Sequence, residues 1–517
     1  MNGAQALIRT LAAAGVDTCF MNPGTSEMHF VAALDAVPEM HGVLALFEGV
    51  ATGAADGFGR MADRPAATLL HLGPGLGNGL ANLHNARKAQ TPVVNIVGDH
   101  AMYHKPYDAQ LESDIETVAR NVSTFIRWSA KTDEVGADAA DTVAAAYGPP
   151  GQVATLILPA DISWSEGGQP APEQAPRPRT LPNDSTVRAV ANALRSDEPA
   201  ILLVGGTACR AGTLALARAI ADATGTKLLC ETFPARIERG AGRASVERVA
   251  YLAEFATTQL EGARHIVLVD AKAPVSFFAY PDKASWLAPA GSDVHTLAGP
   301  TDDSAAALAA LADELGISAG SATLQPLARP DLPSGALTAQ TLCASLGALL
   351  PEGAIVSDEG NTSGLFAAGA SAGAPAHDWL CLTGGAIGQG LPVAVGAAVA
   401  CRDRRVIALE SDGSAMYTLQ SWWTMVREGL DVTTIICNNR SYAVLNMELN
   451  RVGAEAGPKA REMLDLHQPD LDFVALAQGM GMPATRATTA EELNDQLARA
   501  VATDGPSLVE AVVPSIV

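Results

Sequence analysis

Short apolar runs alternate with longer stretches of helical period along most of the chain. Runs of β-branched and aliphatic residues predict buried strands at residues 66–72, 92–98, 200–206, 265–271, 354–360, 405–411 and 432–439. Between them lie Ala- and Leu-rich stretches with apolar residues three or four positions apart, as at Ala4, Leu7, Leu11 and Ala14. This alternation is typical of α/β domains, in which helices flank parallel sheets.

Two Pro-rich segments divide this pattern into three parts. Residues 163–183 and 318–335 are rich in Pro and Gly, which cannot sustain a helix or a central strand. They predict linkers between three segments, 1–165, 184–320 and 335–517, and the middle segment has the runs of a Rossmann-like sheet. Because ligands bind beyond the carboxyl ends of strands in open parallel sheets, the residues after each run are the first candidates for function.

The charge and the cysteines restrict partners and location. The chain has 34 Lys and Arg against 56 Asp and Glu, a formal net charge of −22, and no Lys/Arg-rich run. Nucleic acids and anionic membranes need a positive surface, so we expect neither as a partner, whereas a small anionic substrate needs only a local positive site. There is no signal-peptide pattern, no apolar stretch of the roughly 20 residues that span a bilayer, and no C-x-x-C pair. These features predict a cytoplasmic protein with buried, reduced thiols.

Polar residues follow two of the runs in the third segment. The run 405–410 leads into Ser-Asp-Gly-Ser, which contains Asp412, and the run 432–437 leads into Asn-Asn, which contains Asn439. A carboxylate, an amide oxygen and a backbone carbonyl are hard ligands that suit Mg²⁺. Taken alone, an Asp-Gly or Asn-Asn pair is more often a turn.

Together, this Asp-Gly and Asn-Asn pair resembles the cofactor motif of the thiamine-diphosphate enzymes, and the resemblance extends over nearly the whole chain. The segment order is similar to that of the benzoylformate decarboxylase and acetolactate synthase group: a pyrimidine-binding domain, a Rossmann-like central domain and a diphosphate-binding domain. The resemblance implies thiamine diphosphate held through Mg²⁺, with Asp412, Asn439 and the Ser441 carbonyl as metal ligands. Ser411 stands where the family usually has glycine, so a positive φ there would strain the turn.

Glu48 follows an apolar stretch and opens a predicted helix of small residues. By itself, such a glutamate is more often a capping or dipole residue than a catalyst. In the family that this chain resembles, the glutamate at this position hydrogen-bonds N1′ of the aminopyrimidine and favours the imino tautomer, whose nitrogen removes the C2 proton of the thiazolium. A partly buried carboxylate suits that role, because burial disfavours its charge.

His71 ends a predicted strand and precedes a Gly-rich turn, after which we expect a helix from about Asn78. A histidine on such a rim can shuttle protons near neutral pH, although a structural histidine bonded to the turn is an equally good interpretation of the sequence. The stretch is similar to that of benzoylformate decarboxylase, which implies an acid/base role for His71. The second histidine characteristic of that decarboxylase has no counterpart here, since Phe278 stands at about its place.

A second Gly-rich loop precedes a small-residue helix at residues 390–400, which alone is weak evidence for a phosphate site. By the resemblance, the carbonyl of Gly385 accepts from the 4′-amino group, and Ile387 wedges between the cofactor rings. Further expected cofactor contacts are Asn361, Thr362, Gly413 and Ser414.

A polar loop after the run 92–98 carries His100, His104 and Tyr107, and a solvated loop is an equally good interpretation of it. Acetolactate synthases have a Phe-Gln-Glu element at the matching stretch, whereas this chain has Gln-Leu-Glu at 110–112. The central segment gives no flavin signature either, because its motifs are generic to Rossmann-like sheets. The roles of these loop residues stay open.

The sequence therefore predicts a thiamine-diphosphate- and Mg²⁺-dependent enzyme that decarboxylates a small 2-oxo acid non-oxidatively. His71 and the missing Phe-Gln-Glu element favour this reaction over that of an acetolactate synthase-type carboligase. A 2-hydroxyacyl-CoA lyase is a third alternative, but the sequence shows no basic cluster suited to the phosphates of CoA. A non-catalytic homologue would have no reason to keep Glu48, Asp412 and Asn439. Because the family builds its active sites between chains, the resemblance implies a homodimer or homotetramer. The identity of the 2-oxo acid stays open.

Overall fold

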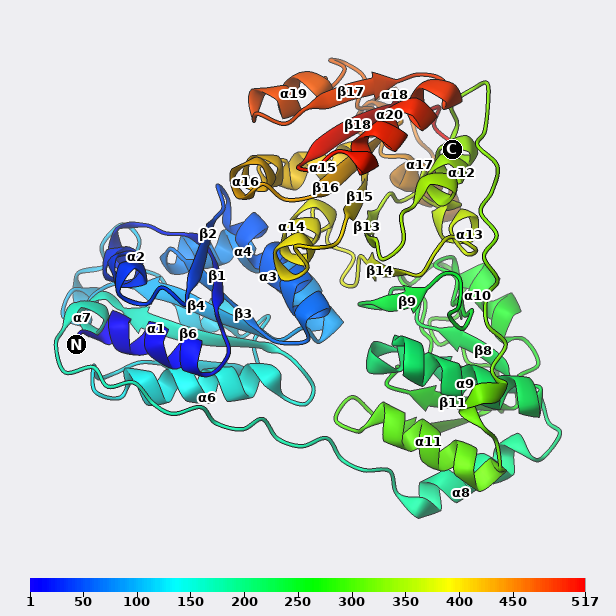
Figure 1. Cartoon of the computed structure of the whole chain (residues 1–517), viewed down its shortest axis with the longest axis horizontal. Helices are drawn as coiled ribbons and strands as arrows, with labels where there is room; N and C mark the ends of the chain where they lie inside the picture. The colour runs from blue at the N-terminus through cyan, green and yellow to red at the C-terminus, as the bar shows by residue number, and fades with distance from the viewer. Residues whose placement is uncertain (517) are drawn as a thin grey trace.

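The first of three sheets has six parallel strands (Figure 1). In spatial order they are β2 (His41–Leu44), β1 (Thr18–Asn22), β3 (Ala66–Leu70), β4 (Val93–Asp99), β6 (Val153–Pro159) and β5 (Phe125–Trp128). The helices of this part are α1 (Gly3–Ala13), α2 (Met28–Ala33), α3 (Glu48–Ala62), α4 (Leu72–Ala89), α5 (Ile115–Ala119), α6 (Val135–Tyr147) and α7 (Ala160–Trp164). One hydrophobic core joins the sheet to α1 and α6 and another joins it to α3 and α4, so helices cover both faces.

The second sheet has five parallel strands. They are β10 (Glu247–Arg248), β8 (Lys227–Cys230), β7 (Ala200–Val204), β11 (His265–Val269) and β12 (Asp293–Ala298). Its helices are α8 (Asp184–Leu194), α9 (Ala211–Thr224), α10 (Ala253–Leu260) and α11 (Ser304–Leu315). The strand order reverses direction beside β7, as in other Rossmann-like sheets.

The third sheet has seven strands. They are β17 (Ala484–Ala487), β18 (Ser507–Val512), β16 (Val432–Asn438), β15 (Val406–Ser411), β13 (Ile355–Glu359), β14 (His377–Cys381) and β9 (Ile237–Arg239). Its helices are α12 (Ala339–Leu349), α13 (Ala367–Ala370), α14 (Gly390–Ala400), α15 (Asp412–Thr418), α16 (Ser421–Glu428), α17 (Ala443–Arg451), α18 (Pro458–Glu462), α19 (Phe473–Gly479) and α20 (Ala490–Ala502). This computed structural model describes residues 1–516, and it confirms the α/β fold and all seven predicted strands.

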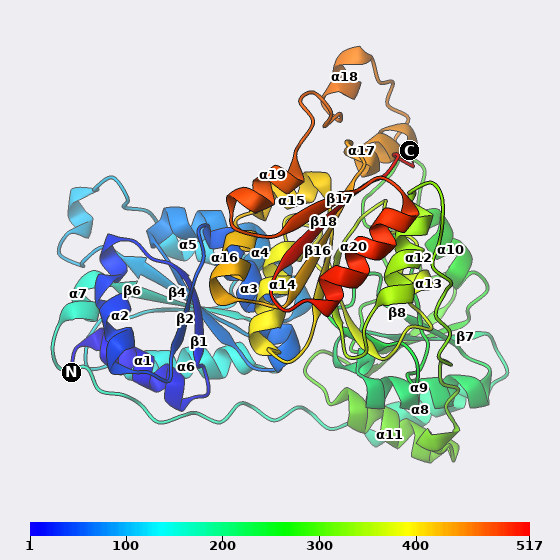
Figure 2. The same ribbon diagram turned by 45° about the horizontal axis from the view of Figure 1, so that its top comes forward.

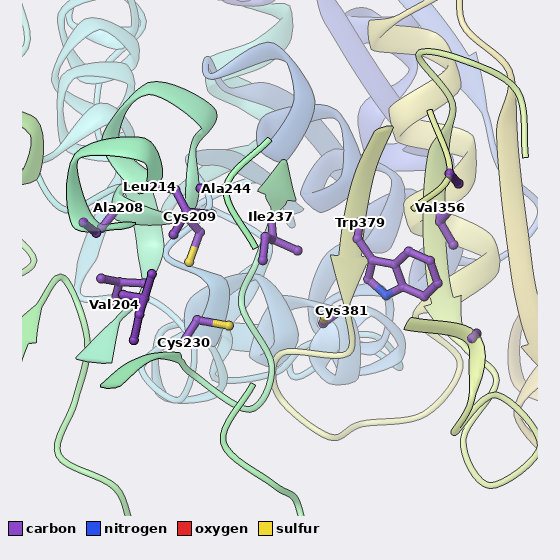
Figure 3. Close-up of a cluster of buried hydrophobic side chains, with 14 of the residues drawn as sticks. Val204, Ala208, Cys209, Leu214, Cys230, Ile237, Ala244, Val356, Trp379 and Cys381 are labelled. Atoms are coloured by element: carbon purple, nitrogen blue, oxygen red, sulfur yellow. The ribbon is translucent and has the colours of Figure 1, made fainter. Parts of the chain in front are cut away.

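The strand β9 departs from a simple division into three segments. It comes from the middle of the chain, yet it pairs antiparallel with β14 at the edge of the third sheet. Figure 3 shows Ile237 of this strand between Cys209 and Cys230 of the second sheet's core and Trp379 of β14. One continuous hydrophobic core therefore joins the second and third parts of the chain.

Helices α3 and α14 join the first and third parts of the chain (Figure 2). Both helices are rich in small residues, and their backbones approach closely. A Cβ added to Gly57 would overlap the carbonyl oxygen of Val393, and one added to Gly396 would overlap that of Ala54. This close packing fixes the start of α3, where Glu48 lies, relative to the loop that precedes α14.

The helix after His71 begins earlier than the sequence predicts. We expected a Gly-rich turn and a helix from about Asn78, whereas α4 begins at Leu72 with His71 as its N-cap residue. A glycine in a helix costs about 1 kcal/mol relative to alanine. Here the glycines let α4 approach its neighbours, since a Cβ on Gly73 would overlap the hydroxyl of Ser113. Tertiary packing therefore overrides the local preference of this stretch.

Other expectations concern linkers, thiols and membranes. Residues 166–183 run without a helix from α7 to α8, and the first two residues of the predicted linker, 163 and 164, belong to α7 (Figure 1). All seven cysteines are free and all are buried except Cys401, which is half-buried. Among the residues that the structure describes, no helix combines the length and the apolar character that a bilayer crossing needs.

Candidate active site

Three loops meet at the carboxyl ends of β13, β15 and β16, which are neighbours in the third sheet. Asn361 Nδ2 donates to Ser411 Oγ at 3.0 Å and to Ser414 Oγ at 3.5 Å. Asn439 Nδ2 donates to Ser363 Oγ at 3.2 Å. The structure therefore brings together the residues that we expected to contact a diphosphate and a metal ion, from stretches far apart in the sequence.

Asp412 is the acidic residue at the centre of these loops. Its Oδ1 accepts a hydrogen bond from Gly413 N at 2.8 Å, and its Oδ2 accepts one from Arg440 N at 2.6 Å. Burial raises the pKa of Asp412 to about 6, although backbone N–H donors act in the opposite direction. A nearby cation would favour the charged form of this buried carboxylate.

The neighbouring oxygens suit the same cation. Asn439 Oδ1 accepts from Ser441 N at 3.0 Å, so the amide oxygen is held within the loop. Ser411 has φ −91° and ψ 153°, an extended conformation that serine adopts without strain, so the strain that we considered for this turn does not arise. Within residues 1–516, no three His, Cys, Asp or Glu side chains cluster as metal ligands, so a metal here would rely on Asp412 and neutral oxygens.

The loop at residues 384–388 is held by a helix from the first part of the chain. Asn85 of α4 donates from Nδ2 to Ala386 O at 2.8 Å and accepts from Ala386 N at 3.2 Å. Asn82 Nδ2 donates both to Gly388 O, at 3.1 Å, and to Gly49 O, at 2.8 Å. A single side chain therefore connects the first turn of α3 to this loop, which carries Gly385 and Ile387.

Glu48 and His71 lie on either side of one glycine. Glu48 is the first residue of α3 and is 6% exposed. A Cβ added to Gly75 would lie 3.1 Å from Glu48 Oε1 and 3.4 Å from His71 Cβ. A glycine at position 75 therefore keeps any side chain from crowding the two residues that we expected to transfer protons.

His71 has a carboxylate partner that the sequence analysis missed. Its Nδ1 lies 2.7 Å from Oε2 of Glu27, which is 1% exposed. Gly24 N donates to the same oxygen at 2.7 Å, and Ser26 Oγ donates to Glu27 Oε1 at 2.5 Å. Glu27 follows β1, the strand that pairs with β3, which leads to His71. Only that pairing, which the sequence pattern does not give, would have pointed to Glu27.

The sequence itself decides which enzymes these loops belong to. Residues 1–119 match the family model described as thiamine pyrophosphate enzyme, N-terminal TPP binding domain. Residues 358–511 match the model described as thiamine pyrophosphate enzyme, C-terminal TPP binding domain. The chain belongs to the thiamine pyrophosphate enzymes.

Individual relatives of this family align along the whole chain. A Mycobacterium tuberculosis protein provisionally named acetolactate synthase large subunit IlvX is 59% identical over 522 residues, which cover 100% of both chains. Benzoylformate decarboxylase of Pseudomonas aeruginosa is 28% identical over 97% of each chain. The solved structure of the thiamine diphosphate-dependent 4-hydroxybenzoylformate decarboxylase of Rhodococcus jostii RHA1 superposes with a TM-score of 0.85, at 22% identity and 99% coverage of both chains. This last similarity shows the fold.

The residues of this thiamine pyrophosphate enzyme fit its cofactor together with Mg²⁺. Asp412, Asn439 and Ser441 offer the hard oxygens that the metal needs beside a diphosphate. Asn361 and Thr362 lie in the loop that meets them, and Asn361 contacts Ser411 and Ser414 directly. Glu48 is nearly buried, as a group that hydrogen-bonds a pyrimidine nitrogen requires.

Two regions lack residues that the family resemblance led us to look for, namely the second histidine of benzoylformate decarboxylase and the Phe-Gln-Glu element of acetolactate synthases. Near the place of the missing second histidine, the ring of Phe277 packs against Gly385, and its Cζ would lie 2.6 Å from a Cβ added there. In the loop after β4, Lys105 lies between Asp99 and Glu112, at 2.9 Å and 2.7 Å. The ring of His100 packs against that of His104. The structure shows no hydrogen bond from this loop to Glu48 or His71 among the described residues.

A buried pair of carboxylates lies beside the loop at residues 384–388. Glu359 accepts from Gly388 N at 2.8 Å and from Gly390 N at 2.6 Å, and it is 1% exposed. Glu410 stands opposite it on β15, and its Oε2 is buried without a hydrogen-bond partner in the described chain. Burial raises the pKa of Glu359 to about 7, and burial and the charge of Glu359 raise that of Glu410.

The cofactor-free protein should therefore lose stability as the pH rises from about 4.5 to about 7. In that range the folded state binds more protons than the unfolded state, so ionisation of Glu359 opposes folding, by up to about 3 kcal/mol. Glu359→Gln cannot ionise and should weaken this dependence. Urea unfolding at pH 5 and pH 7.5, without cofactor or metal, measures the effect. An equal loss of stability in both proteins would contradict it.

Proposed function

We propose that this chain is a thiamine-diphosphate- and Mg²⁺-dependent decarboxylase that acts non-oxidatively on a small 2-oxo acid. The observation that carries the proposal is the hydrogen-bonded pair of His71 and Glu27, which stands next to Glu48 across Gly75. A decarboxylase must return a proton to carbon after CO₂ has left, and a histidine held by a carboxylate is suited to that transfer.

The protein residues divide the work around the cofactor. When bound, thiamine diphosphate would supply a carbon nucleophile and an electron sink. Asp412, Asn439 and the Ser441 carbonyl would hold Mg²⁺, Asn361, Thr362, Gly413 and Ser414 would contact the diphosphate end, and Gly385 and Ile387 would support the rings. Glu48 shares a proton at the pyrimidine end, where its near-complete burial excludes competing water.

Glu27 controls which nitrogen of His71 is free. The carboxylate accepts the hydrogen bond of Nδ1, so Nε2 stays available to give or take a proton. The hydrogen bonds from Gly24 N and Ser26 Oγ keep Glu27 in position. His71 therefore acts as the general acid and base, and Glu27 sets its orientation.

The side chains near Gly385 favour a substrate with an apolar group on its 2-oxo acid. Phe277 contacts Phe278 and Tyr251, with ring centroids 4.8 Å and 5.2 Å apart, and Phe278 contacts Tyr280. Phe277 and Phe278 are 42% and 53% exposed, so their faces are available to a ligand. The aromatic substrates in the names of the decarboxylase relatives agree with this surface.

An acetolactate synthase-type carboligase is the second candidate function, supported by the name of the 59% identical relative. We expect a bound flavin in an acetolactate synthase-type enzyme. The turn after β7 in the central sheet is unfavourable for the phosphates of a flavin dinucleotide. Beside the turn after β7, Asp270 Oδ2 accepts from Thr207 N and Oγ1, both at 2.8 Å. Glu231 also lies against this turn, at Gly205. Two carboxylates at this position repel the phosphates of a dinucleotide.

The two candidate functions are separated by their products. Purified protein with thiamine diphosphate and Mg²⁺ is incubated with pyruvate, with branched 2-oxo acids and with aromatic 2-oxo acids. An aldehyde with one fewer carbon supports the decarboxylase, whereas an acyloin or 2-hydroxy-2-acyl acid as the main product supports the carboligase. Stoichiometric flavin in the purified protein would also favour the carboligase.

The His71→Ala variant should lose about 10²–10⁴-fold in the rate of aldehyde formation, because a general acid and base is removed. Its affinity for the cofactor should change little, since we assign His71 no contact with the diphosphate or the metal. Steady-state kinetics and cofactor titration measure the two quantities. His41→Ala is the matched control, because His41 is exposed, pairs with Glu428 and begins β2, at the edge of the first sheet opposite to His71. If the rate of aldehyde formation in His71→Ala fell only severalfold or less, His71 would have a structural role instead.

We further propose that the enzyme works as a homodimer or homotetramer with active sites between chains. Large apolar side chains stand exposed beside both halves of the site. Leu46, two residues before Glu48, is 48% exposed, Leu365, three residues after Thr362, is 67% exposed, and Tyr417 beside Gly388 is 53% exposed. A second copy of the chain would cover them and exclude water from the cofactor.

A further inference from the structure

The two oxygens of Glu48 have different surroundings. Oε2 accepts a hydrogen bond from Asn78 Nδ2 at 3.0 Å. Oε1 lies close to Gly75, since a Cβ added to that glycine would come within 3.1 Å of it. One oxygen is therefore held by a neighbouring side chain, while the other has no hydrogen-bond partner among the described residues.

Asn78 reaches Glu48 from α4, which connects several parts of the site. Asn82 and Asn85 follow it by one and two helical turns on the same face, and they bind the backbone of Gly388 and Ala386. Asn78 differs from them because it binds a side chain, and because it is exposed rather than buried. Its side chain therefore contributes little to the hydrophobic core, and packing of α4 does not require its hydrogen bond to Glu48.

We propose that Asn78 is a positioning residue that holds Glu48 by Oε2 so that Oε1 is presented to the pyrimidine nitrogen of the cofactor. This inference rests on the proposed function, in which Glu48 shares a proton with that nitrogen. The Asn78 amide restricts rotation of the carboxylate at the point where α3 begins. It acts on the cofactor only through Glu48.

The absence of a charge on Asn78 matters for proton transfer to Glu48 as much as the position of its amide does. A lysine or arginine at this distance would stabilise the charged carboxylate strongly and oppose the transfer of a proton to it. An amide donates one hydrogen bond without adding a charge, so Glu48 is oriented yet still able to hold a proton.

Asn78→Asp is the most informative substitution, because it keeps the shape of the side chain and replaces the donor by a carboxylate. Asn78→Ala removes the contact altogether. We expect both variants to slow hydrogen–deuterium exchange at C2 of the bound thiazolium by about 10- to 100-fold, the size expected for a hydrogen bond to a charged group. The circular-dichroism band of the bound aminopyrimidine should change with it, while the affinity for cofactor and Mg²⁺ and the melting temperature stay close to wild type.

Gly77→Ala is the matched control, since the neighbouring helix position has open space around it. Its exchange rate should equal that of the wild type. If Asn78 only supported α4, its variants would melt earlier or bind less cofactor, and exchange per bound cofactor would be unchanged. That result would overturn the proposal.

Glu48→Gln measured alongside separates two kinds of failure. Slow exchange in Glu48→Gln but normal exchange in both Asn78 variants would reject the role of Asn78 and leave the proposed function standing. Normal exchange in Glu48→Gln would reject the proposed function itself, whatever the Asn78 variants do.

Discussion

Glu48→Gln should lower the rate of hydrogen–deuterium exchange at C2 of bound thiamine diphosphate by about 10²–10⁴-fold, which corresponds to roughly 3–5 kcal/mol of barrier. Glutamine keeps the size and a hydrogen-bonding group but cannot share a proton. Because Glu48 is 6% exposed, water cannot easily replace the missing carboxylate. Quenched-flow exchange followed by NMR measures this step without any substrate.

The fold and the metal site should survive this substitution. The loops that we propose as the metal site follow β15 and β16 of the third sheet, whereas Glu48 opens α3 of the first part of the chain. Melting temperature and Mg²⁺-dependent cofactor binding are the controls. Exchange as fast as in the wild type would show that Glu48 is only a residue at a helix terminus.

Asp412→Ala should abolish the Mg²⁺-dependent tight binding of the cofactor, weakening it by about 100-fold or more. The only carboxylate among the expected metal ligands is lost. The cofactor-free protein should remain folded, because the substitution also removes a buried carboxylate whose pKa burial raises to about 6. Thermal unfolding with and without thiamine diphosphate and Mg²⁺ measures the change, since a ligand at 100 times its Kd stabilises by about 2.7 kcal/mol.

Asp403→Ala provides the comparison for this variant. Asp403 is exposed in the turn that leads into β15, at the end of the strand opposite to Asp412. The Asp403→Ala variant should gain as much stability from cofactor and metal as the wild type does. If Asp412→Ala gains as much as well, Asp412 does not hold the metal.

The strands and the order of the main loops could be predicted from the sequence, because both depend on local patterns. Continuous apolar runs gave the buried strands, and the residues after them in the third sheet, such as Asp412 and Asn439, meet in space since carboxyl ends of neighbouring parallel strands share an edge. The assignment of individual residues to cofactor and metal stays a prediction until the variants are measured.

The features that the sequence did not predict depend on contacts between distant segments. Glu27 lies under His71 because β1 and β3 are neighbours, and no local pattern reveals that pairing. The predicted start of α4 was wrong because glycines such as those after His71 are typical of a turn. In the structure they lie within the helix, where Gly73 packs against Ser113. Asn78 gains its significance only from its contact with Glu48.

The position of β9 limits how freely this architecture can be recombined. Residues 237–239 leave the central sheet and complete the third sheet at β14. Exchange of the whole middle segment for that of a distant relative would therefore replace an edge strand of the sheet that carries the proposed metal ligands. If the new strand did not match, the backbone of β14 would be left unpaired at an exposed edge, where it could join another chain. The middle segment is thus no interchangeable module, and a successful chimaera would have to retain Ile237–Arg239 with the sheet that they complete.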